Sequence, residues 1–64
     1  MTDSEEQLRR LKNTVMGAGH RLSLLAQSGE LEADAGKELS EISSELAEAA
    51  RRLGQLLAAM RLDR

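Results

Sequence analysis

The chain has 64 residues, a net charge of −2 at pH 7, and no cysteine, proline, phenylalanine, tyrosine or tryptophan. This length accommodates one small domain, and the lack of cysteine excludes a disulfide framework and a thiolate metal site. The longest apolar runs, such as LLAAM, are too short for a signal peptide or a membrane span. We therefore expect a cytoplasmic protein with no membrane partner.

Alanine, leucine, glutamate, arginine and glutamine are abundant, and these residues favour helices over strands. The expected fold class is all-α. A domain of this size buries only about 60% of the surface of its unfolded chain. Because no large aromatic side chain is present to fill a core, we expect self-association or a partner to stabilise it.

The first half of the chain predicts a helix over residues 4–28. Its apolar and small residues recur at alternating spacings of three and four, as the a and d positions of a coiled coil do: Leu8, Leu11, Val15, Ala18, Leu22 and Leu25.

Residues 29–32 are expected to form a turn, with Gly29 in the left-handed conformation that closes a helix. The second half then predicts a helix over residues 33–62. Its a and d positions are Leu39, Ile42, Leu46, Ala49, Leu53, Leu56 and Met60.

The two stripes match when the helices run antiparallel. The a positions then pair Leu8 with Leu53, Val15 with Leu46, and Leu22 with Leu39. Each d layer sets one large residue against one small residue: Leu11 and Ala49, Ile42 and Ala18, Leu25 and Ala35. Residues 1–64 are therefore predicted to form a single antiparallel two-helix hairpin with a coiled-coil seam.

One flank of this hairpin consists mostly of small residues, which would let another helix approach closely. Glycine inside a helix costs about 1 kcal/mol relative to alanine, so its presence here calls for a compensating contact. We expect this small-residue flank to be the interface of a homodimer, a four-helix bundle, or of a helical protein partner; the alternative is that small residues merely tolerate exposure. Its residues are Met16, Gly19, Ser23, Ala26, Gly36, Ser40, Ser43, Ala47, Ala50, Gly54 and Leu57.

The C-terminal end of the second helix is expected to extend past the first helix. It would then expose an apolar cluster to a partner. This open-end cluster comprises Leu56, Leu57, Met60 and Leu62.

Charge is unevenly distributed along the chain. Residues 28–48 contain seven acidic residues and one lysine, whereas residues 49–64 contain four arginines and one aspartate. At the open end of the hairpin, opposite the turn, a candidate phosphate-binding patch comprises Arg9, Arg10, Lys12, Arg51 and Arg52. Carboxylates four residues before three of these arginines, and the lack of an aromatic residue to stack bases, argue against a nucleic-acid partner.

No residue pattern supports catalysis or metal binding. His20, the only histidine, lies at an f position away from the seam, with no thiolate, second imidazole or nucleophile to work with. Glu30, Glu32 and Asp34 lack the glycine and the closing glutamate of a calcium loop. We expect no enzymatic activity, no metal and no cofactor.

In size and plan the chain resembles the plasmid RNA-binding protein Rop, and the stretch RLSLLAQSGELEAD is similar to the approach to the turn in that protein. The resemblance implies a hairpin that dimerises into a four-helix bundle. It does not extend to RNA binding, because Rop uses an aromatic residue on its first helix that this chain lacks. The chain is also similar in length to the hairpin chaperones of type III secretion needle subunits, and LAEAARRLGQLL resembles their second helix.

The expected function is a non-enzymatic protein–protein interaction, carried out by a small homo-oligomeric regulator, adaptor or assembly chaperone. One alternative is a Rop-like RNA- or DNA-binding dimer that uses the basic open end. A further alternative is a type III secretion needle-type chaperone.

Overall fold

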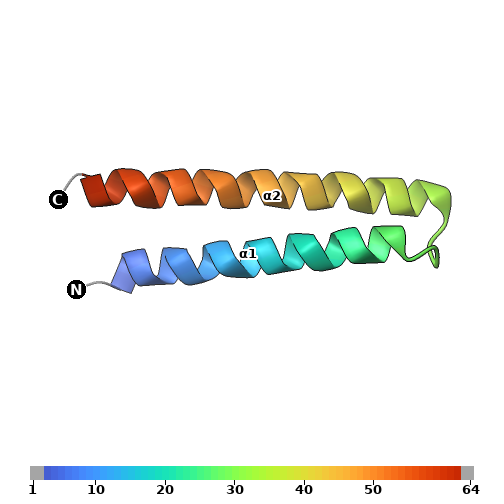
Figure 1. Ribbon diagram of the computed structural model, residues 1–64, viewed down its shortest axis with the longest axis horizontal. Coiled ribbons are helices and arrows are strands. Elements are labelled where there is room, and N and C mark those ends of the chain that lie inside the picture. The colour runs from blue at the N-terminus through green and yellow to red at the C-terminus, as the bar shows by residue number, and fades with distance from the viewer. Residues whose placement is uncertain (1–2, 63–64) are drawn as a thin grey trace.

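The structure, a computed structural model, describes residues 3–62 as two α-helices joined by a short turn. Helix α1 spans Asp3–Gln27 and helix α2 spans Ala33–Leu62, compared with the expected 4–28 and 33–62. The helices run antiparallel, so the start of α1 and the end of α2 lie together at the open end (Figure 1). The predicted all-α helical hairpin is confirmed, and it is an elongated molecule of 48 × 15 × 10 Å.

The turn is built around Gly29 and Ser28. Gly29 has a φ of +83°, the left-handed conformation predicted for it. The Ser28 hydroxyl donates a hydrogen bond to the Leu25 carbonyl at 2.8 Å and accepts one from the Glu30 amide at 3.2 Å. The amide of Gly36 donates to the Glu32 carbonyl at 2.8 Å, which starts the hydrogen bonding of α2. Local interactions thus reverse the chain without support from a core.

The contact between the helices is rotated from the predicted one. The residues that are buried or half-buried along both helices occupy the a and e positions: Glu5, Leu8, Lys12, Val15, Gly19, Leu22 and Ala26 on α1, and Gly36, Leu39, Ser43, Leu46, Ala50, Leu53 and Leu57 on α2. We call these fourteen residues the seam. The prediction of an a and d seam is wrong, because Leu11, Leu25 and Leu56 at d positions retain 56%, 49% and 48% of their exposure.

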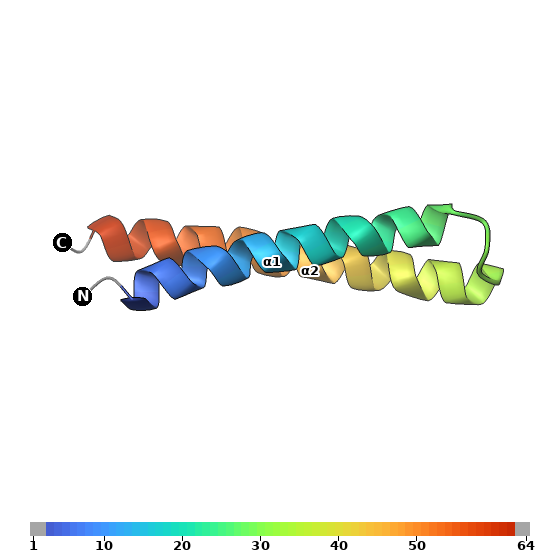
Figure 2. The ribbon, with the colours of Figure 1, turned by 90° about the horizontal axis from the view of Figure 1, so that it is seen from below.

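Side-chain size explains this rotation. Every d layer contains one large residue, which would hold the helix axes apart, whereas most e positions near the middle of the hairpin are glycine, alanine or serine. Turning both helices toward the e positions brings their backbones closer and gains dispersion contacts between them. Seen from below, α1 crosses α2 at a shallow angle, as helices packed over a long contact do (Figure 2).

The hairpin buries little apolar surface. Ala50 and Leu57 are its buried apolar residues within 4–62, and no side chain in that range is fully buried. The leucines, valine and isoleucine at the other seam and d positions are half-buried or exposed. A single hairpin therefore has a contact between two helices but almost no core.

The turn geometry predicts opposite effects for two glycine substitutions. Gly29→Ala should lower the free energy of unfolding by about 1 kcal/mol, because a Cβ is disfavoured at positive φ. Gly17→Ala is the matched control: a Cβ at this helical position meets only open space, so it should raise stability by up to ~1 kcal/mol. Thermal melts at one fixed protein concentration measure both, and equal effects would contradict the assignment of Gly29 as the turn residue.

Candidate functional site

Most of the predicted small-residue flank lies between the two helices of the hairpin rather than on an outer surface. Six of its residues belong to the seam: Gly19, Ala26, Gly36, Ser43, Ala50 and Leu57. Ala50 and Leu57 are only 5% and 8% exposed. These residues are therefore occupied by contacts inside one chain and are not free to bind a second protein.

The closest approach of the helices is at Gly19. A Cβ on Gly19 would lie 3.3 Å from the Leu46 Cβ and 3.5 Å from the Ser43 carbonyl oxygen. The Ser43 hydroxyl donates a hydrogen bond of 2.7 Å to the Gly19 carbonyl oxygen, which ties the middle of α2 to the middle of α1. At Gly36, a Cβ would lie 3.5 Å from the Ala26 carbonyl oxygen. The small residues thus compensate for their helix cost by allowing this approach.

The remaining flank residues lie on one broad side of the hairpin, over a shallow groove. The groove has a volume of about 480 Å³, and its floor is formed by small residues of both helices. It is lined by Lys12, Met16, Gly19, His20, Ser23, Ser43, Ala47, Ala50, Arg51 and Gly54. Ser40, the last flank residue, is exposed beyond it.

The opposite broad side of the hairpin carries the large apolar residues, and sequence reasoning did not identify it as a surface. Because a and d positions share one face of each helix, turning the e positions inward leaves the d residues outside. We call this surface the leucine face. It comprises Leu8, Leu11, Val15, Ala18, Leu22 and Leu25 on α1, and Ala35, Leu39, Ile42, Leu46, Ala49, Leu53, Leu56 and Met60 on α2, all half-buried or exposed.

The open-end cluster is not a single exposed patch. Leu57 is buried in the seam and Met60 is half-buried, because α1 begins at Asp3 and covers this part of α2. Leu56 is 48% exposed and belongs to the leucine face, and Leu62 is 86% exposed. The expected overhang of the second helix, with all four residues uncovered, is therefore wrong.

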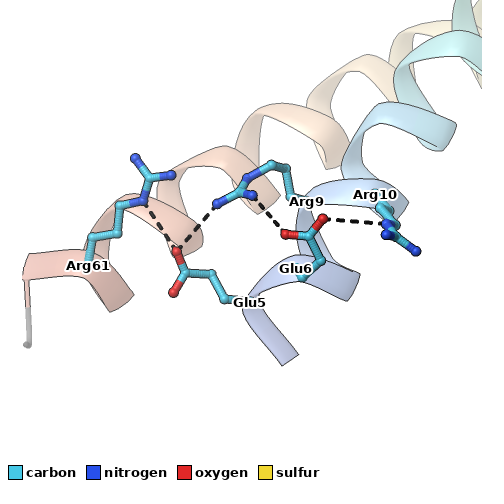
Figure 3. Close-up of polar contacts among 5 residues, drawn as sticks. All are labelled: Glu5, Glu6, Arg9, Arg10 and Arg61. Atoms are coloured by element: carbon cyan, nitrogen blue, oxygen red, sulfur yellow. Dashed lines mark hydrogen bonds and ion pairs between the residues drawn. The ribbon is translucent and has the colours of Figure 1, made fainter. Parts of the chain in front are cut away.

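Ion pairs close the open end of the hairpin (Figure 3). One carboxylate oxygen of Glu5 lies 3.5 Å from Arg9 of the same helix and 3.3 Å from Arg61 of α2. Glu6 lies 3.0 Å from Arg9 and 3.5 Å from Arg10, so it contacts arginines of α1 alone. Glu5 is only 8% exposed, which makes it the residue through which the two helix ends are joined.

These ion pairs occupy much of the candidate phosphate-binding patch. Arg9 and Arg10 contact carboxylates, and Arg51 donates hydrogen bonds to Glu48, one of them at 3.0 Å from Nε to Oε1. This hydrogen bond from Arg51 lowers the pKa of Glu48 from its ordinary value and raises that of Arg51. Lys12 and Arg52 make no ion pair within residues 3–62. The five cations therefore do not form one continuous free patch.

The structure brings no catalytic or metal-binding group together in the part of the chain that it describes. His20 is exposed at the edge of the groove beside Arg51, with no acidic residue in the same lining. No group of three histidine, cysteine, aspartate or glutamate residues within 3–62 is placed to hold a metal ion. Across the same range, neither helix is apolar enough over a sufficient length to cross a membrane.

Comparison of the chain with protein-family models, with curated proteins and with solved structures gives no match. The leucine face is thus the surface that requires a functional explanation, and its chemistry must be argued from its own residues.

The close approach predicts a strong size limit at Gly19. Gly19→Leu should lower the free energy of unfolding by about 1–3 kcal/mol, because the new side chain would push Leu46 and the α2 backbone away. Gly17→Leu is the control, since position 17 of the same helix faces open space. Chemical denaturation at one protein concentration would compare them, and equal stability of the two variants would exclude the close approach.

The ion pairs predict that Glu5 and Glu6 differ in reach. Glu5→Gln should accelerate amide hydrogen exchange in the last turn of α2 as well as in the first turns of α1, because it weakens the contact with Arg61. Glu6→Gln should affect α1 only. The free-energy change should be ~1 kcal/mol or less, since the arginines are solvent-exposed. Unchanged exchange in α2 for Glu5→Gln would contradict the inter-helix role.

Proposed function

We propose that this chain is a non-catalytic protein–protein interaction module that acts through its leucine face, and that a second copy covers this face to form a four-helix bundle. The observation that carries the proposal is the exposure of Leu11, Leu25 and Leu56 in line with half-buried leucines on both helices. In four-helix bundles the a and d positions of all helices point to a shared core. The leucine face presents half of such a core.

The exposed area of the chain supports a partner of this size. The chain exposes 5094 Å². A compact folded protein of its mass, 7.0 kDa, exposes about 4,000 Å². The excess of roughly 1,000 Å² is close to the ~800 Å² that each partner buries in a protein–protein interface of standard size. Covering one face with a second hairpin would bring the exposed area into the normal range.

The proposal assigns the interface to the leucine face instead of the small-residue flank. The seam uses the flank's central residues, and the groove above them is lined by Lys12, His20 and Arg51 as well as by small residues. Apolar burial contributes roughly 25 cal/mol for each Å² removed from water, so the larger apolar side chains favour the leucine face.

The proposed bundle predicts that charge on the leucine face blocks association. Leu11→Glu should convert the dimer to monomer at micromolar concentration, because a carboxylate would be buried against a second apolar face without a partner. Leu11 is 56% exposed in the single hairpin, so the substitution leaves the hairpin able to fold. Light scattering coupled to size-exclusion chromatography measures the mass directly.

Ala47→Glu on the groove side is the matched control, since it adds the same charge to an exposed position of the opposite side. It should leave the dimer intact. A dimer that resists Leu11→Glu but dissociates with Ala47→Glu would move the interface to the groove side. A wild-type protein that is monomeric at high micromolar concentration would exclude the homodimer.

A further inference from the structure

We propose that the two hairpins of the bundle lie with their turns at opposite ends, so that each helix packs antiparallel to the same helix of the partner copy. This inference rests on the proposed four-helix bundle and specifies its partner as a second copy in one orientation. The alternative places both turns at the same end and packs α1 of one copy against α2 of the other.

The relief of the leucine face fits a second copy. In its middle layers, exposed Leu11 on α1 lies beside small Ala49 on α2, and in the next layer Ile42 on α2 lies beside small Ala18 on α1. The next layer toward the turn returns to a large residue on α1, with Leu25 beside Ala35. Large and small residues therefore alternate between the helices along the face, and a large residue fills a neighbouring layer best when it meets a small one.

Two-fold symmetry can satisfy this relief in both orientations. With turns apart, Leu11 packs on Ala18 of the partner copy and Ile42 on Ala49 of the partner copy. With turns together, these pairs become Leu11 on Ala49 and Ile42 on Ala18. Shape thus supports self-association of the face but does not select the direction.

Charge selects the direction. The half of the hairpin nearest the turn, residues 21–45, contains six acidic residues and two basic residues. The open half, residues 3–20 and 46–62, contains four acidic and six basic residues. Turns together would stack the acidic half of one copy on the acidic half of the other. Turns apart set each acidic half against the basic half of the partner copy.

The length of the molecule makes this difference effective. Charges in water are screened over about 8 Å at physiological ionic strength. The hairpin is 48 Å long, so each half responds mainly to the half that faces it and not to the net charge of the whole copy. The edges of the leucine face do not oppose the choice, because Glu38 lies near Arg52 of the partner copy with turns apart and near Arg21 of the partner copy with turns together. Both orientations therefore offer one such pair on each edge.

Single cysteines test the direction, because the natural chain has none. Thr14 is exposed beside the leucine face near the middle of the hairpin, where the two-fold axis passes with turns apart. Thr14→Cys should form a disulfide-linked dimer under mild oxidation, in high yield. With turns together, Thr14 would instead face Glu45 of the partner copy and the cross-link would not form.

A spin label gives an independent distance. Leu31→Cys lies in the turn, and labels attached there should be separated by a distance comparable to the 48 Å length of the molecule. With turns together, the labels would lie roughly 10–20 Å apart, the spacing of neighbouring helices with their side chains.

The outcomes separate the two proposals. A light-scattering dimer in which Leu31 labels are close and Thr14→Cys does not cross-link overturns the orientation and leaves the bundle standing. A monomer by light scattering overturns both. A dimer with distant labels and an efficient Thr14→Cys cross-link supports the arrangement with turns apart.

Discussion

The close approach of the two helix backbones at Gly19 and Ser43 is the constraint on which the rest of the structure depends. The Ser43 hydroxyl reaches the Gly19 carbonyl oxygen at 2.7 Å, and a Cβ on Gly19 would crowd the Leu46 Cβ at 3.3 Å. Such a contact is possible only when both helices turn their small e residues toward each other. The orientation of every other side chain around the two helix axes follows from that rotation.

The rotation has one main cost, which is that it leaves the larger apolar residues outside. Leu11, Leu25 and Leu56 remain about half exposed, while Ala50 and Leu57 are buried. The hairpin therefore separates two tasks that a larger domain would combine in one core. Small residues and a few polar contacts hold the helices together, and the large apolar residues stay available for a partner.

The architecture followed from the sequence because it depends on local signals. Gly29 is the one residue with positive φ in the described range, and the periodic spacing of leucines gave both helices. The pairs Gly36 with Ala26 and Gly19 with Ser43 were also correctly placed opposite each other. Their rotation was not predictable from spacing alone, because a, d and e positions all repeat with the same alternation of three and four. Only the competition between bulky d layers and close backbone contact, which depends on three-dimensional packing, places the small residues inside and the leucines outside.

The hairpin topology also sets an order of folding. The Ser43–Gly19 hydrogen bond joins residues 24 apart in sequence, whereas the Arg61–Glu5 contact joins residues 56 apart. Since each doubling of a closed loop costs roughly 0.6 kcal/mol more in chain entropy, contacts near the turn form most easily and shorten the loop for those that follow. The two helices accordingly close from Gly29 outward, and the arginine contacts of Glu5 are the last to form and the first to open.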